Sequence, residues 1–187
     1  GGDVARTYWL SQMKSIHITD PHLAPPGAQI WGLDQADRLA RVVADIVARH
    51  PDADLVALTG DLAHAGEPAA YAELERLLRP LPMPVRMTLG NHDSRANFLA
   101  AFPDAPRDGA GHVQHVHDAP GLRLVFADTH EPGWSGGRLC VQRLDWLESA
   151  LAESPGEAIV FLHHPPSKLG VRHFEAITLD APGLGDV

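Results

Sequence analysis

Residues Ala53–Asp61 have the sequence ADLVALTGD, in which a near-continuous apolar run ends in a glycine and a carboxylate. Such a run is expected of a β-strand that other elements cover on both faces. Gly60 allows a sharp turn after the strand, because glycine adopts backbone angles that other residues avoid. The stretch therefore predicts a buried strand that delivers the side chain of Asp61 at its carboxyl end.

On both sides of this stretch, apolar residues recur with periods of two and of 3.6, which indicate alternating strands and helices. The predicted strands are residues 14–19, 53–59, 85–89, 113–117, 122–128 and 158–162. The predicted helices are residues 67–78, 94–102 and 141–151, and one capped by Asp34 with an apolar face of Leu39, Val42, Val43, Ile46 and Val47. We expect an α/β domain with helices on the outside, and an antiparallel pair turning at Pro120-Gly121.

The length of 187 residues allows one compact domain with a real core and is short for two. Residues 1–12 are interpreted as an extension (a leader, tag or linker), because Met13-Lys14 leads straight into a strand. Residues 13–187 are then the domain. No apolar run approaches the roughly 20 residues of a membrane span, and no signal peptide is evident, so cytoplasm is the default location.

The formal net charge of −9 disfavours a protein that wraps long nucleic acid with a basic surface. It does not disfavour a small anionic substrate, because bound cations can reverse the potential inside an acidic site. The count of 12 histidines raises the expectation of metal binding. Self-association into a homo-oligomer is left open.

Polar residues of the kind that bind metals follow four of the predicted strands. They are Asp20 and His22, then Asp61, then Asn91-His92-Asp93, and finally His163-His164. Ligands at the carboxyl ends of neighbouring strands converge on one crevice of an open α/β sheet. In an extended Asp20-Pro21-His22 segment, the two outer side chains would share one face and could hold one cation.

These blocks resemble the calcineurin-like metallophosphoesterase superfamily, whose motifs D-x-H, G-D, G-N-H-[DE] and H-x-P occur here in order. The segments TGDLAHAGEPAAY, at residues 59–71, and DTHEPGWSGGRL, at residues 128–139, are similar to its bacterial cyclic-nucleotide phosphodiesterase (class III) branch. The resemblance covers the chain from about Lys14 onward. It implies an αββα sandwich.

The resemblance also implies a centre of two metal ions held by Asp20, His22, Asp61, Asn91 and His163. Asp61 would bridge the ions, and iron, manganese or zinc suits ligands of this kind. A metal-bound hydroxide would attack the phosphorus of a small phosphodiester, possibly a 3′,5′-cyclic nucleotide. His92 would stabilise the phosphoryl oxygens or protonate the leaving alkoxide, and Asp93 could orient it.

Several residues allow a second interpretation. H-x-P selects His163 as the ligand, but His164 is an alternative one position away. The H-x-H spacing of His115 and His117 is interpreted as an exposed strand face rather than a metal site. His64, Glu67 and His130 are pocket candidates without an assigned role. Three tryptophans are interpreted as packing residues, namely Trp31, Trp134 and Trp146. Of these, Trp134 is the best placed to touch a ligand.

The family ends its catalytic region with a G-H-x-H block, and residues 167–187 contain none. We therefore expect a chain truncated at its C-terminal end, with weaker metal binding and slow turnover. Glycerophosphodiesters, phosphonate monoesters and phosphomonoesters are alternative substrates. A non-catalytic scaffold is the alternative from another class of function.

Overall fold

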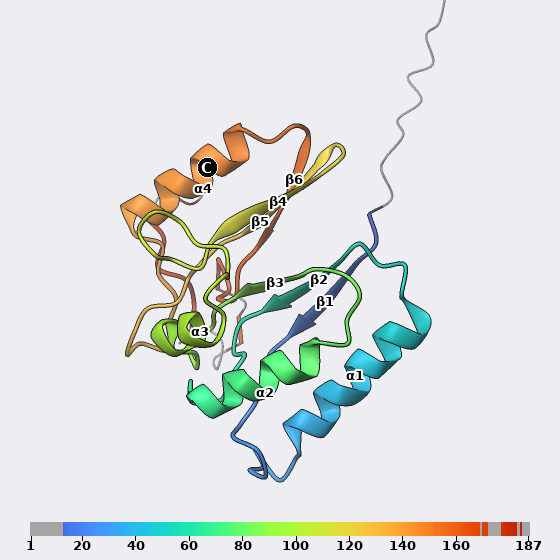
Figure 1. Ribbon diagram of the computed structural model, residues 1–187. Helices are drawn as coiled ribbons and strands as arrows, with labels where there is room; N and C mark the ends of the chain where they lie inside the picture. The colour runs from blue at the N-terminus through green and yellow to red at the C-terminus, as the bar shows by residue number, and fades with distance from the viewer. Residues whose placement is uncertain (1–12, 169, 172–176, 183, 185–187) are drawn as a thin grey trace, which may run out of the picture.

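The computed structural model describes residues 13–168, 170–171, 177–182 and 184 (Figure 1). The predicted extension, residues 1–12, lies outside them. The described part contains ten elements in the order β1-α1-β2-α2-β3-α3-β4-β5-α4-β6. In that part, no helix is both long and apolar enough to span a membrane.

The first sheet is parallel and is built from β1 (Ser15–Thr19), β2 (Leu55–Thr59) and β3 (Val85–Thr88), in that order. Thr19 pairs with Thr59, which pairs with Thr88 on its other side. The three strands thus end level with one another. The residues that follow them leave the sheet at the same edge, as the sequence predicted.

The second sheet consists of β4 (His115–Ala119), β5 (Leu122–Phe126) and β6 (Glu157–Phe161). The predicted hairpin is confirmed, because β4 and β5 pair antiparallel. β6 pairs with β5 in parallel, and the last paired residues are Phe126 and Phe161. The chain then continues from Phe161 to His163. The expectation that all four blocks follow strands of one open sheet is therefore wrong, because the His163 block follows a strand of this second sheet.

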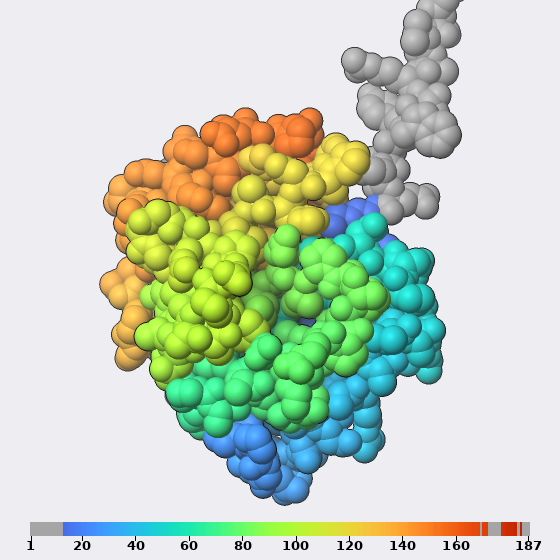
Figure 2. Space-filling model, viewed as in Figure 1, coloured from blue at the N-terminus to red at the C-terminus, as the bar shows by residue number. Residues whose placement is uncertain are grey.

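Helices cover the outer face of each sheet, which gives four layers (Figure 1). α1 (Gln35–Arg49), α2 (Pro68–Leu78) and α3 (Arg95–Ala101) contribute to the core of the first sheet, and α4 (Val141–Ala152) packs on the second. In Figure 2 the surface of α3 and its following loop lies between those of α2 and α4. Between the sheets, Leu55 and Ala57 of β2 pack with Leu124 and Phe126 of β5. The predicted αββα sandwich is confirmed.

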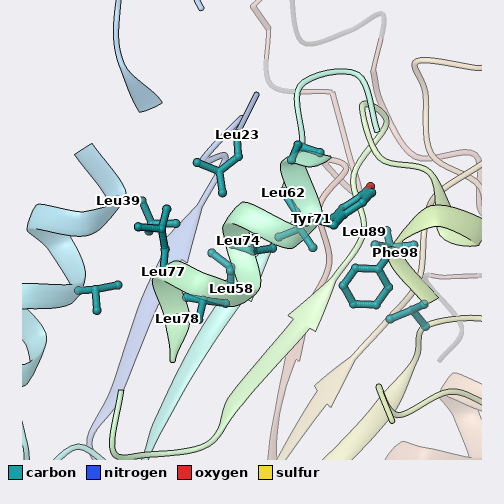
Figure 3. Close-up of a cluster of buried hydrophobic side chains, with 14 residues drawn as sticks. Leu23, Leu39, Leu58, Leu62, Tyr71, Leu74, Leu77, Leu78, Leu89 and Phe98 are labelled. Atoms are coloured by element: carbon teal, nitrogen blue, oxygen red, sulfur yellow. The ribbon is translucent and has the colours of Figure 1, made fainter. Parts of the chain in front are cut away.

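The core of the first sheet shows why β2 reads as an apolar run. All five residues of β2 are buried, because one face meets the helices and the other meets the second sheet. Leu58 lies in the cluster with Leu74 of α2, and Tyr71 and Phe98 pack edge to face at its end (Figure 3). This buried strand fixes the position of Asp61.

The helix predicted after Asp34 forms, and the Asp34 carboxylate accepts a hydrogen bond from the N–H of Asp37 (2.9 Å). Its buried face is narrower than predicted, because Val42 and Val47 are 42% and 37% exposed. Both lie at the flanks of the stripe that turns toward the core. The buried residues are Leu39, Val43 and Ile46.

The predicted exposed strand face at His115 and His117 is wrong for His115. Its side chain is buried and its ring stacks on Phe126, with the two centroids 4.8 Å apart. Strand alternation turns this side chain toward the first sheet, where Arg86 lies close enough to affect it electrostatically. Burial lowers the pKa of His115 to about 4.

Candidate metal centre

Asp61 lies at the middle of the candidate centre. Its backbone follows β2 directly, and its side chain is only 6% exposed. One carboxylate oxygen, Oδ1, accepts the N–H of His92 (2.9 Å) and lies 3.4 Å from Nε2 of His163. The other, Oδ2, lies 3.4 Å from Nε2 of His22. Both oxygens of one carboxylate thus face imidazole nitrogens from different loops.

The loop after β1 brings Asp20 and His22 to this carboxylate. The N–H of His22 donates to the carbonyl of Asp61 (2.9 Å), and that of Leu23 donates to the carbonyl of Leu62 (3.0 Å). Nε2 of His22 lies 3.8 Å from the Asp20 carboxylate. Burial lowers the pKa of His22, which favours the neutral imidazole that metal binding requires.

The predicted extended conformation of Asp20-Pro21-His22 is wrong. Asp20 and His22 have φ of +53° and +46°, and Asp61 has φ of +47°. Left-handed backbone is uncommon outside glycine and costs on the order of 1–3 kcal/mol per residue. In the described residues, the only other non-glycine with positive φ is Trp31. Strained backbone is therefore concentrated at three of the predicted ligands and at this tryptophan.

Asn91 and His163 form the other side of the centre. Oδ1 of Asn91 lies 3.4 Å from Nε2 of His163, whose side chain is 8% exposed. His164 turns away, and its Nδ1 pairs with the hydroxyl of Thr129 (2.7 Å). Burial lowers the pKa of His164 to about 3. The structure thus brings His163, and not His164, to Asp61 and Asn91.

Two glycines allow the loops to approach this closely. A Cβ added at Gly90 would lie 2.2 Å from Oδ1 of Asp61, and one added at Gly60 would lie 2.0 Å from the ring of His163. Any side chain at either position would displace a predicted ligand. The glycines of the G-D and G-N-H-D motifs are therefore required by space at the centre as well as by the turn.

The donor atoms fit a metal centre better than a hydrogen-bond network. Carboxylate, imidazole and amide oxygen are ligands of iron, manganese and zinc. The separations of 3.4 Å around Asp61 exceed the usual length of an N–H···O bond. Asp20, His22 and Asp61 could hold one cation, and Asp61, Asn91 and His163 offer donors for a second.

His92 stands beside this group with a half-exposed ring. Its Nδ1 lies 2.6 Å from the carbonyl oxygen of His64, and its Nε2 lies 4.0 Å from Oδ2 of Asp61. A carbonyl oxygen can only accept, so Nδ1 carries a proton and Nε2 is turned toward the centre. The expected contact from Asp93 to this ring is absent among the described hydrogen bonds.

Asp93 has a different task, which is to join two loops. Its buried carboxylate accepts the N–H groups of Gly90, Leu62 and Ala63 and the hydroxyl of Tyr71, at 2.8–3.1 Å. Burial raises the pKa of Asp93 to about 6, although these donors oppose the shift. The side chain fixes the loop after β3 against the loop after β2.

A second buried carboxylate, Asp128, was not singled out in the sequence. It is fully buried and receives two hydrogen bonds from Arg95 (2.9 and 3.0 Å), while Arg143 lies 4.0 Å away. Both arginines also donate to the carbonyl of His130. Burial lowers the pKa of His130, which lines a pocket of about 510 Å³ beside Asn91. The sequence did offer a signal for Asp128, which is a carboxylate that follows the apolar strand β5.

His64 and Trp31 also lie closer to the centre than the sequence indicated. The ring of His64 stacks on His92 at 5.1 Å, and its Nδ1 lies 3.5 Å from Nδ1 of His22. Trp31 contacts the rings of both His22 and His64 at 5.3 Å. Its interpretation as a packing residue is wrong, because 71% of it is exposed.

Several curated proteins are similar to this chain and are named as phosphodiesterases. A probable cyclic nucleotide phosphodiesterase of Rhodopseudomonas palustris is 42% identical over 91% of this chain and 64% of its own length. The 3′,5′-cyclic adenosine monophosphate phosphodiesterase CpdA of Pseudomonas aeruginosa is 33% identical over 89% and 60%. The glycerophosphodiester phosphodiesterase GpdQ of Enterobacter lignolyticus is 30% identical over 90% and 62%. The chain thus spans somewhat less than two thirds of each.

The solved structure of purple acid phosphatase PPD1 from yellow lupin (Lupinus luteus) seeds has a TM-score of 0.57 and 17% identity, over 82% of this chain and 30% of that one. At this identity the likeness concerns the fold. Residues 13–184 match the family described as calcineurin-like phosphoesterase. Since this match covers nearly all of the chain, the chain belongs to the calcineurin-like phosphoesterase family.

Proposed function

We propose that the protein is a dinuclear-metal phosphodiesterase that hydrolyses a small phosphodiester, with a 3′,5′-cyclic nucleotide as the first candidate. The observation that carries the proposal is the meeting of Asp20, His22, Asn91 and His163 around the carboxylate of Asp61. The proposal concerns the whole protein, because the chain spans less than two thirds of the length of these curated relatives.

The donor set supports a pair of iron, manganese or zinc ions. Asp20 and His22 would hold one ion, Asn91 and His163 the other, and Asp61 would bridge them. When bound, such ions would neutralise phosphoryl oxygens and supply a water of lowered pKa as the nucleophile. Asp93 would keep the loops after β2 and β3 in position for this task, because its carboxylate accepts hydrogen bonds from both.

His92 is proposed to donate a proton to the leaving oxygen. Because Nδ1 is held by the carbonyl of His64, only Nε2 can face a bound ester. The protonated ring would give up its Nε2 proton as the phosphorus–oxygen bond breaks, so that the alcohol leaves uncharged. The 37% exposure of the side chain leaves room for a substrate to reach it.

The names of the relatives support a phosphodiester of low molecular mass. The Rhodopseudomonas palustris and Pseudomonas aeruginosa relatives are named for cyclic nucleotides, and the Enterobacter lignolyticus relative for glycerophosphodiesters. Glycerophosphodiesters are therefore the second candidate. The net charge of −9 supports a small substrate over a long nucleic acid.

The test is hydrolysis by the purified full-length protein, first stripped with a chelator and then loaded with Mn²⁺, Fe²⁺ or Zn²⁺. Substrates are bis-p-nitrophenyl phosphate, cyclic AMP, cyclic GMP and glycerophosphoethanolamine. Asp61→Asn should abolish turnover and reduce the bound metal found by elemental analysis. Asp45→Asn, which removes an equal charge from an exposed ion pair on α1, should change neither. A loaded wild type that cleaves no phosphodiester would favour the scaffold alternative.

A further inference from the structure

Trp31 is a large aromatic side chain that stands exposed at the edge of the candidate centre. It is 71% exposed, whereas aromatic side chains usually bury most of their area. Its ring lies 5.3 Å from the ring of His22 and 5.3 Å from that of His64, with interplanar angles of 78° and 82°. The side chain is thus positioned against the centre without being packed into the core.

The backbone holds Trp31 in this position. Ile30 and Leu33 exchange two backbone hydrogen bonds of 3.0 Å across a tight turn that contains Trp31 and Gly32. Trp31 itself has φ of +52°, which is a genuine outlier for a bulky residue. A glycine at this position would adopt the same turn without strain. Strain kept at an exposed aromatic residue points to a use for its ring.

The rings that contact Trp31 also contact His92, the proposed proton donor. His64 lies between Trp31 and His92, and it stacks on His92 with an interplanar angle of 24°. His22 contacts both Trp31 and His92 through its ring. These four side chains form an aromatic wall beside the proposed proton donor.

We infer that Trp31 is the stacking platform for the nucleobase of a nucleotide-derived phosphodiester, an inference that rests on the proposed function. A flat indole face accepts any base, because every base has a π-face. Trp31 would therefore favour cyclic nucleotides over esters without a ring and discriminate little between adenine and guanine. A quaternary ammonium group, as in glycerophosphocholine, is less favoured, since its recognition relies on a cage of several large aromatic rings, and the other three rings of this wall are imidazoles.

The test compares Trp31→Leu, which keeps apolar bulk, with Trp31→Phe, which keeps a ring, in the full-length Mn²⁺-loaded protein. For cyclic AMP and cyclic GMP, Trp31→Leu should raise KM about tenfold with kcat nearly unchanged, the size of one base–aromatic contact. Trp31→Phe should restore most of this loss. For glycerophosphoethanolamine and glycerophosphocholine, both variants should match the wild type.

A binding measurement separates this inference from the proposed function, because it needs no turnover. By calorimetry, Trp31→Leu should weaken binding of 5′-AMP about tenfold and leave ribose 5-phosphate unchanged. An equal loss of affinity for 5′-AMP and ribose 5-phosphate would overturn the role of Trp31. In the kinetic test, a rise in KM confined to glycerophosphocholine would overturn it as well. Failure of the wild type to cleave any phosphodiester would instead overturn the proposed function. Thermal unfolding of both variants checks that the fold is kept.

Discussion

Oδ1 of Asp61 lies 3.4 Å from Nε2 of His163, although Asp61 follows a strand of the first sheet and His163 follows a strand of the second. The candidate centre therefore spans the interface between the two sheets. A cation bound by both side chains would join the sheets directly. Metal binding and the stability of the sandwich should then be linked.

Metal loading should raise the melting temperature of the wild type, because a ligand that binds only the folded state stabilises it. At free metal about 100 times the dissociation constant, the gain is about 2.7 kcal/mol. His163→Ala should lose most of this gain, and His164→Ala should keep the dependence on metal although its fold is weakened. Differential scanning fluorimetry with and without Mn²⁺ measures both. An equal response to metal in the His163 and His164 variants would contradict the placement of the centre.

Asn91→Ala should lower kcat/KM by at least about 100-fold, since loss of an outer-shell partner alone costs 10–100-fold in a metal site. The side chain contributes an oxygen near His163 and is only partly buried. Far-UV circular dichroism should therefore be unchanged. A variant that keeps full activity on bis-p-nitrophenyl phosphate would remove Asn91 from the proposed centre.

The sequence predicted the strands that deliver the site because their signals are local. β2 is buried on both faces and reads as an apolar run, and Gly60 and Gly90 mark the turns that bring the loops together. Five donor residues were named from motifs, and the structure brings all five together. The strand predictions needed only the chain neighbours of each residue, whereas the set of five donors was implied by the resemblance to a known family.

What the sequence did not predict depends on contacts between distant segments. His115 was expected on an exposed face, but the packing of one sheet on the other buries it. Asp93 was expected to orient His92, whereas the carbonyl of His64 contacts that ring. Trp31 gave no periodic signal, because its position depends on a turn between two elements. Side-chain partners across loops cannot be read from spacing alone.

Asp128→Ala should destabilise the protein by about 3–5 kcal/mol, because it removes the fully buried carboxylate that pairs with Arg95 and leaves the buried Arg143 with Glu131 as its carboxylate partner. The loop that carries His130 should loosen with it, since Arg95 and Arg143 hold its carbonyl. Asp45→Ala removes a carboxylate from the exposed pair with Arg49 and should cost less than about 1 kcal/mol. Urea unfolding of both variants gives the comparison. Equal costs would mean that the buried network contributes little.

His115 should make the protein less stable as the pH falls from 7 to 5. Burial lowers its pKa in the folded state to about 4, whereas the unfolded chain titrates near 6.5. Between these values the unfolded state binds the proton and the folded state does not, so stability rises with pH across this window. The loss between pH 7 and pH 5 is about 2 kcal/mol from this residue.

The variant His115→Leu isolates this contribution, because the ring stacks on Phe126 and neither nitrogen has a hydrogen-bond partner in the described structure. Other buried groups titrate in the same range: His164 acts in the same direction, and Asp93, with its pKa raised to about 6, acts in the opposite one. Both are present in wild type and variant and cancel in the difference. Urea unfolding at pH 7 and pH 5 should show the wild type losing about 2 kcal/mol more than the variant. Parallel losses would mean that protonation of His115 is not opposed by the fold, and that the space between the sheets admits the charge.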